Sequence, residues 1–73
     1  MIYDECELGM KVCIMMPENT VLHQETGTIA AINGADEILI RFDVYKPKFD
    51  QFEDARRGSV IVGVENLHRI NDL

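Results

Sequence analysis

The chain has 73 residues, 7 Lys and Arg against 13 Asp and Glu, a net charge of -6 and 47% hydrophobic residues. A chain of this length buries only about 60% of the surface that its unfolded form exposes, which is enough for one compact core. Large multi-substrate enzymes, in which a second domain walls a deep cleft, are therefore excluded. The hydrophobic content is also too high for a disordered acidic tail, so we expect a single folded domain over residues 1–73.

The charge and the apolar runs narrow the class of protein further. Nucleic-acid binding through phosphate neutralisation depends on Lys and Arg, which are outnumbered here. No apolar run approaches the roughly 18 residues of a membrane-spanning helix, and the first residues are acidic where a secretory signal is basic. We expect a cytoplasmic protein in which Cys6 and Cys13 stay reduced, with no membrane partner.

Short apolar runs separated by glycine and proline are typical of an all-β domain. In chain order, they predict five strands over residues 10–16, 28–32, 37–43, 59–64 and 67–70. The first strand follows an N-terminal arm of residues 1–8 and ends at Pro17. The third strand alternates strictly, so that Ile38, Ile40 and Phe42 share the face that we expect to be buried.

Two connections between these strands carry local signals. Residues 17–26 read as a loop in which only Val21 and Leu22 are offered to a core. Asn33-Gly34 is a pair that tight β-hairpins favour, because both residues tolerate positive φ. We therefore expect a hairpin between the second and third strands.

One segment breaks the pattern, because residues 44–57 hold three of the five aromatic residues and four of the seven basic ones. The segment has a charge of +1, which leaves -7 on the rest of the chain. We predict a helix of about two turns in this segment. Asp50 is a suitable N-cap, Glu53 stands three residues later as in a capping box, and Gly58 follows the expected end of the helix. The predicted fold is thus mainly β, with a short helix or long loop inserted between the third and fourth strands.

Aromatic and arginine residues carried on a loop are what binding hot spots favour. We therefore predict that the segment contacts a partner protein, with the loop around Leu22 as a second candidate contact. The predicted contact residues are Tyr45, Lys46, Lys48, Phe49, Phe52, Arg56 and Arg57. The alternative is that Phe49 and Phe52 only fill one end of the β domain.

The spacing of glycine and aliphatic residues resembles a known family over nearly the whole chain. Gly9-x-x-Val12-x-Ile14, Gly27-x-Ile29-x-x-Ile32 and Ile38-x-Ile40-x-Phe42-Asp43 resemble the opening of SH3-like β-barrels. The similarity is to the KOW-type domains of ribosomal and transcription factors. It extends to the barrels of the photosystem I accessory subunit and of the ferredoxin:thioredoxin reductase variable chain. The ending, Val64-Glu65-Asn66-Leu67-x-x-Ile70, resembles the short turn and last strand of such barrels.

This resemblance implies a five-stranded SH3-like barrel that is not catalytic and that binds RNA or packs against a larger protein. KOW-type domains usually carry basic residues in the loops flanking the position of Gly27. Here residues 22–26 read Leu-His-Gln-Glu-Thr, which favours a protein partner over RNA.

Catalytic and metal-binding patterns are not found in the sequence. The only serine, Ser59, stands at the start of a strand, and neither histidine lies in a motif that pairs a base with a nucleophile. A zinc site built from Cys6, Cys13, His23 and His68 fits none of the usual paired spacings. We therefore expect no enzymatic activity, no metal and no cofactor.

Three functional hypotheses remain. The first is a non-enzymatic protein-binding module that acts as an accessory subunit or regulator of a larger protein. The second is KOW-like RNA or DNA binding, which only the resemblance implies. The third is that the acidic body, including Asp36 and Glu37, inhibits a nucleic-acid-handling protein as small phage-encoded inhibitors do. In addition, the strand at the edge of the sheet could pair with a partner or with a second copy.

Overall fold

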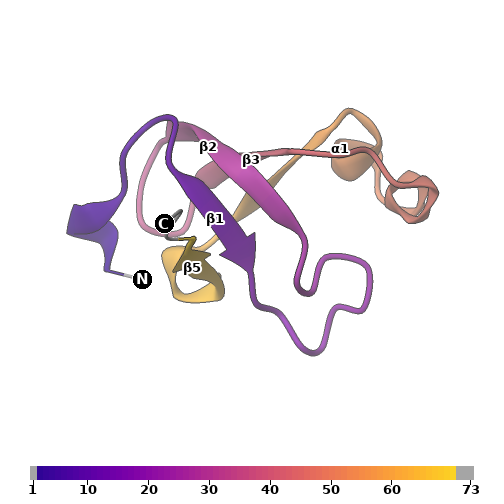
Figure 1. Cartoon of the computed structure of the whole chain (residues 1–73), viewed down its shortest axis with the longest axis horizontal. Coiled ribbons are helices and arrows are strands. Elements are labelled where there is room, and N and C mark those ends of the chain that lie inside the picture. The colour runs from indigo at the N-terminus through magenta and orange to yellow at the C-terminus, as the bar shows by residue number, and fades with distance from the viewer. Residues whose placement is uncertain (1, 71–73) are drawn as a thin grey trace.

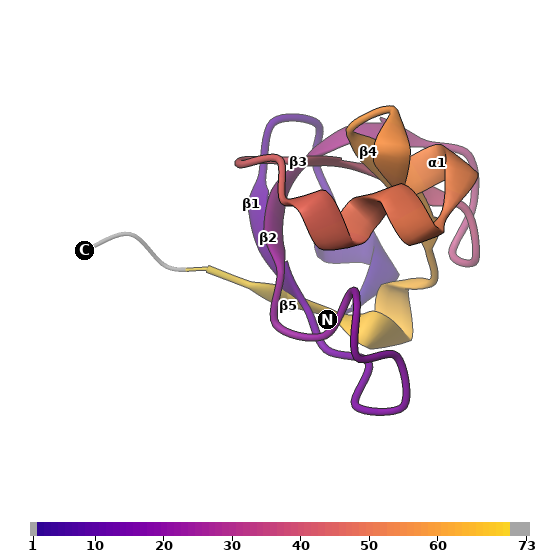
Figure 2. The ribbon, with the colours of Figure 1, turned by 90° about the vertical axis from the view of Figure 1, so that its right-hand side faces the viewer.

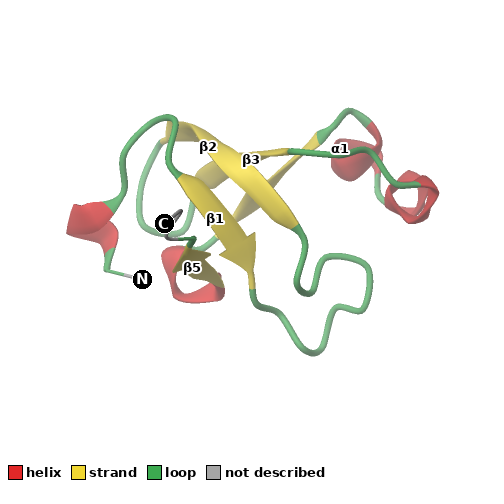
Figure 3. Ribbon diagram, viewed as in Figure 1, coloured by secondary structure: helices red, strands yellow, loops and turns green. Residues whose placement is uncertain are grey.

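The computed structural model describes residues 2–70, which form one five-stranded antiparallel sheet with short helical turns around it (Figure 1, Figure 3). The strands are β1 (Lys11–Ile14), β2 (Thr26–Ile32), β3 (Ile38–Phe42), β4 (Ser59–Val62) and β5 (Leu67–Arg69). The helical elements are η1 (Tyr3–Glu5), η2 (Pro47–Gln51), α1 (Glu53–Arg56) and η3 (Val64–Asn66). The mainly β prediction is confirmed, and every predicted strand is present with its ends shifted by two residues or less.

The sheet curls but does not close, which corrects the barrel closure of the predicted fold (Figure 2). Its hydrogen-bonded order is β4-β3-β2-β1-β5, so β4 and β5 are its two edges. The sheet stays open because of the connection between β4 and β5. The turn η3 follows β4 almost at once and is held by the hydrogen bond from the Asn66 N–H to the Gly63 carbonyl, at 3.0 Å. The chain then runs along β1, with His68 opposite Cys13.

The central strand β2 bends and approaches β3 closely. Its register with β3 shifts between Ile29 and Ala31, which is a β-bulge. A Cβ on Gly27 would lie 2.5 Å from both the carbonyl oxygen of Arg41 and the Cγ2 of Ile40. Glycine at this position therefore allows the close approach of the two strands.

The hairpin between β2 and β3 is confirmed, but its connection is longer than a two-residue turn. The Asn33 N–H donates to the Glu37 carbonyl at 3.0 Å, and the Glu37 N–H donates to the Gly34 carbonyl at 3.1 Å. A two-residue turn would place a small alanine opposite Ile32, whereas the observed loop places Ile38 there. Pairing of two large apolar side chains, rather than the turn residues, decides the register.

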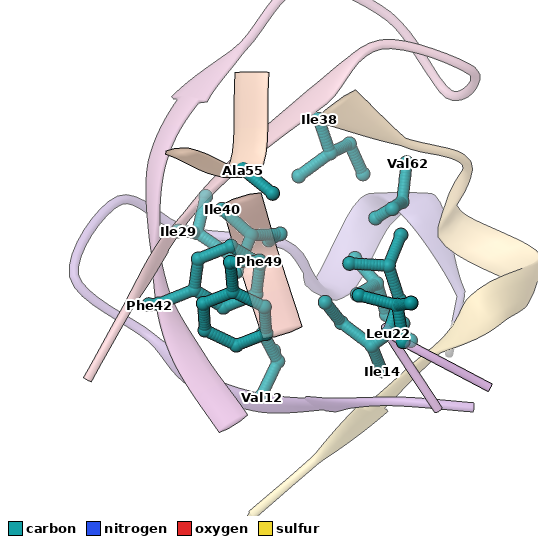
Figure 4. Packing of buried hydrophobic residues seen from close by; sticks show 12 residues of the cluster. Val12, Ile14, Leu22, Ile29, Ile38, Ile40, Phe42, Phe49, Ala55 and Val62 are labelled. Atoms are coloured by element: carbon teal, nitrogen blue, oxygen red, sulfur yellow. The ribbon is translucent and has the colours of Figure 1, made fainter. Parts of the chain in front are cut away.

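The core lies on the concave side of the sheet and draws on every strand (Figure 4). The buried face expected for the third strand is confirmed, as is the burial of Val21 and Leu22. Leu22 is only 5% exposed, so the loop around it does not offer that side chain to a partner. The buried hydrophobic residues are Val12, Ile14, Val21, Leu22, Ile29, Ile38, Ile40, Phe42, Phe49, Ala55, Val62 and Leu67.

Residues 44–57 form two helical turns rather than the single helix predicted. The first turn, η2, begins at Pro47, whose fixed φ and missing N–H suit a helix start. Phe52 is extended, with φ -122° and ψ 134°, and so separates η2 from α1. Asp50 lies inside η2 and is not an N-cap, because its carboxylate accepts a hydrogen bond from the Tyr45 hydroxyl.

The end of α1 follows the prediction. Gly58 has φ +92°, in the left-handed region that favours glycine. Its N–H donates to the carbonyl of Ala55 at 3.0 Å, and the Arg57 N–H donates to that of Asp54. These bonds close the turn, bury Ala55 and direct the chain into β4.

Candidate partner-binding surface

The aromatic residues of the 44–57 segment are divided between the core and the surface. Phe49 is 0% exposed, and its ring stacks on Phe42 with centroids 4.0 Å apart and planes 15° apart (Figure 4). Tyr45 meets the same ring edge-on, with centroids 6.3 Å apart. Phe49 is therefore a core residue, which removes it from the predicted contact set. Phe52 instead stays 43% exposed.

A buried carboxylate anchors the start of the segment. The side chain of Glu25 is 8% exposed, at the end of the loop before β2. The Nζ of Lys46 lies 2.9 Å from its Oε1, and the ammonium of Lys48 pairs with its Oε2. A buried charge is tolerated when it is paired in this way. The two lysines predicted to contact a partner thus hold the segment against the loop.

The protonation state of Glu25 follows from this arrangement. Burial acts to raise the pKa of the carboxyl group, because it disfavours the charged form. The hydrogen bonds and positive charges of Lys48 and Lys46 outweigh burial and hold the pKa of Glu25 below its ordinary value. Glu25 is therefore ionised at neutral pH, as the two ion pairs require.

We expect this pairing to make the protein less stable in acid. Because the pKa of Glu25 is lower in the folded state, its contribution is complete above the ordinary value of 4.5 and is lost as the pH falls through the folded pKa. Glu25→Gln is expected to lower the free energy of unfolding by about 1–3 kcal/mol at pH 7. Denaturant unfolding between pH 3 and pH 7 measures the difference between the two proteins, which should shrink towards the acid end.

The control for this experiment is Glu53→Gln. Glu53 also forms an ion pair, with Arg57 at 3.1 Å, but its side chain is 73% exposed. Exposed pairs contribute about 0–1 kcal/mol, so this variant should follow the wild type at every pH. A Glu25→Gln profile that coincides with that of the wild type at every pH would show that the buried pairing does not contribute to folding stability.

The outer side of the segment carries exposed aromatic and arginine side chains. Tyr45 is 52% exposed, and its hydroxyl is held by Asp50. Arg56 is exposed and forms no ion pair with another residue in the range 2–70, whereas Arg57 is bound to Glu53. Of the predicted contact residues, Tyr45, Phe52, Arg56 and Arg57 are exposed and are not bound to the buried Glu25.

Val44 and Ile61 are among the exposed apolar residues that sequence reasoning missed. Val44 is 67% exposed immediately before Tyr45, and Ile61 is 51% exposed on β4. The signal for Val44 was its position just beyond the alternating pattern of the third strand. Ile61 lies in an unbroken β-branched run, in which the sequence alone does not separate the two faces of the strand.

The four residues considered for a zinc site do not form one cluster, although His68 lies opposite Cys13 across the β1·β5 pair. Cys6 and Cys13 are free thiols, and burial raises the pKa of each. The Nδ1 of His23 accepts the N–H of Met16 at 3.1 Å, which fixes this ring within its loop. Among residues 2–70, no group of three or more His, Cys, Asp and Glu side chains is placed to hold a metal ion.

Comparison with protein-family models, with curated proteins and with solved structures finds no match to this chain. The fold of residues 2–70 is a small, mainly β domain with an open five-stranded sheet. None of the helices within residues 2–70 has the length and apolarity needed to cross a membrane.

Proposed function

We propose that this chain is a non-catalytic protein-binding module that acts as an accessory subunit or regulator of a larger protein. The observation that carries the proposal is the exposure of Tyr45 and Phe52 on a segment fixed from beneath by Phe49 and Glu25. Solvent-exposed aromatic residues on an anchored loop bury a large area on binding and lose little conformational entropy. The proposed setting is the cytoplasm, where Cys6 and Cys13 stay reduced.

The proposed contact surface consists of Tyr45, Phe52, Arg56 and Arg57. The Tyr45 ring is held at both ends, by the edge of Phe49 and by the carboxylate of Asp50. Arg56 is the segment's cation without an ion pair to the described residues, so a partner carboxylate would not have to displace an existing partner. These features favour a partner protein whose contact surface is apolar with an acidic rim.

The SH3-like assignment is part of this proposal. It is supported by the meander from β1 to β4, by the short turn η3 and by the return of the last strand beside β1. The KOW-like alternative is less well supported, because Lys46 and Lys48 are occupied by Glu25. Phosphate binding depends on available cations.

The test is an affinity capture from a lysate of the source organism, with and without nuclease, followed by mass spectrometry. We expect a partner protein to be retained after nuclease treatment. The affinity of this partner is then measured for the wild-type chain and for the Phe52→Ala and Arg56→Ala variants. Each substitution should weaken binding by about tenfold or more. Tyr3→Ala is the matched control, because Tyr3 is an aromatic residue 41% exposed on η1, outside the surface.

Two results would contradict the proposal. If retention disappears with nuclease and falls steeply with salt, the KOW-like alternative replaces it. If the partner binds Phe52→Ala as tightly as wild type but loses affinity for charge reversal at Asp36 and Glu37, both exposed, then the acidic inhibitor hypothesis replaces it.

A further inference from the structure

The face of the sheet opposite the core carries a group of sulfur and nitrogen side chains outside the proposed contact surface. Val12 and Ile14 are fully buried in the core, so the residue between them, Cys13, points to the opposite face. His68 lies directly opposite Cys13 on β5, and its neighbour Leu67 is fully buried. The side chains of Cys13 and His68 therefore lie next to each other on the outer face of the adjacent strands β1 and β5 (Figure 1).

Met15 adds a second sulfur atom to this group. Its N–H donates to the Asn66 carbonyl at 2.7 Å, which continues the pairing with β5 past the end of β1 and places Met15 on the same face as Cys13. The thiol sulfur of Cys13 lies 3.8 Å from the thioether sulfur of Met15 and 3.8 Å from the carbonyl oxygen of Ile14. His68 is exposed, and its ring has no hydrogen-bond or ion-pair partner within residues 2–70.

The separation of the two sulfur atoms matches that of two ligands on one metal ion. A metal–sulfur bond is about 2.3 Å long, so two such bonds to sulfur atoms 3.8 Å apart enclose an angle of roughly 110°. This angle suits an ion with three or four ligands. Directly opposite residues of a strand pair have Cβ atoms about 5 Å apart, so the exposed ring of His68 reaches the same ion by rotation of its side chain.

We propose that Cys13, Met15 and His68 bind a monovalent copper ion, Cu⁺, on the outer face of the β1·β5 pair. The choice of ion follows from the ligands. Thiolate and thioether sulfur atoms are soft ligands that select Cu⁺, and imidazole also suits copper, whereas zinc sites use thiolate, imidazole and carboxylate. Binding replaces the proton of the Cys13 thiol with the ion and releases that proton to solvent. Copper stays in the +1 state, so no electron is transferred.

The test titrates the purified, reduced chain with Cu⁺ in the absence of oxygen, in competition with a coloured Cu⁺ chelator. One ion per chain is expected, and X-ray absorption of the complex should show two sulfur ligands and one nitrogen ligand. A side chain that only positions a metal ligand is worth about 10–100-fold in metal affinity. Cys13→Ser, Met15→Leu and His68→Gln should therefore each weaken Cu⁺ binding by at least about tenfold. No partner protein is needed, so the result is independent of the proposed function.

Each variant has a matched control that makes the same chemical change elsewhere in the chain. Cys6→Ser removes the other thiol, whose sulfur lies 3.8 Å from the carbonyl oxygen of Ile2. Met16→Leu changes the next methionine, which packs against the core, and leucine conserves its volume. His23→Gln removes the other imidazole and keeps an acceptor for the Met16 N–H. All three controls should leave the Cu⁺ affinity unchanged, and circular dichroism verifies that every variant is folded.

Several results would overturn the proposal. A Cu⁺ affinity that Cys6→Ser lowers as much as Cys13→Ser would show that copper binds to any thiol of the chain. An affinity that either Met15→Leu or His68→Gln leaves unchanged, or one ion per two chains, would contradict the site of three ligands. Zn²⁺ should bind more weakly than Cu⁺ and should be insensitive to Met15→Leu. A Zn²⁺ affinity equal to that of Cu⁺ or higher would overturn the choice of ion.

Discussion

Phe49→Ala is expected to lower the free energy of unfolding by about 3–5 kcal/mol, the range for loss of a buried aromatic side chain. Phe49 is fully buried, and its ring stacks on Phe42. Its removal opens a cavity between the 44–57 segment and the sheet and also takes the aromatic support from Tyr45. Urea unfolding followed by circular dichroism measures the effect, and for a domain this small such a loss leaves little native stability.

Phe52→Ala is the matched control, since it makes the same chemical change three residues away at a side chain that is 43% exposed. We expect it to cost about 1 kcal/mol or less while it weakens partner binding. The pair of variants thus separates folding from recognition within one segment. Equal losses of stability from the two variants would show that Phe52 is also a core residue in solution.

Gly27→Ala is expected to be the second most damaging change, with a loss of about 3 kcal/mol, at the upper end for overpacking. The added methyl group would meet the Arg41 carbonyl oxygen and the Ile40 side chain at 2.5 Å. The carbonyl belongs to the backbone of the neighbouring strand, so it can move only if the β2·β3 ladder distorts. Thermal and denaturant unfolding should both show the loss.

Gly63→Ala provides the comparison, because the atoms nearest to a Cβ there belong to the Glu65 carboxylate, the closest at 2.5 Å. That group is the end of a flexible side chain and can rotate away. Gly63 has φ -79° and ψ 154°, which alanine also adopts without strain. The stability of the Gly63→Ala variant should therefore stay within about 0.5 kcal/mol of that of the wild type. A larger loss at Gly63 than at Gly27 would contradict this account of the two glycines.

Much of the fold could be predicted because it depends on local patterns. The alternation of Ile38, Ile40 and Phe42 determines which face of the third strand is buried, whatever the rest of the chain does. Gly58 is needed wherever a helix ends in the left-handed conformation. The strand positions and the end of α1 were accordingly correct. The helix start at Asp50 was wrong, because a Tyr45 hydroxyl from outside the helix bonded the carboxylate that the cap would have used.

The sequence by itself determined the fold class, the strands and the position of the unusual segment, since all of these follow from short-range periodicity. Only the tertiary structure decided the roles within the segment. It assigned Phe49 to the core, Lys46 and Lys48 to the buried Glu25, and Tyr45 and Phe52 to the surface. It also left the sheet open at β4. These outcomes depend on contacts between residues far apart in the chain, such as Glu25 with Lys46, and no local pattern encodes which distant groups will meet.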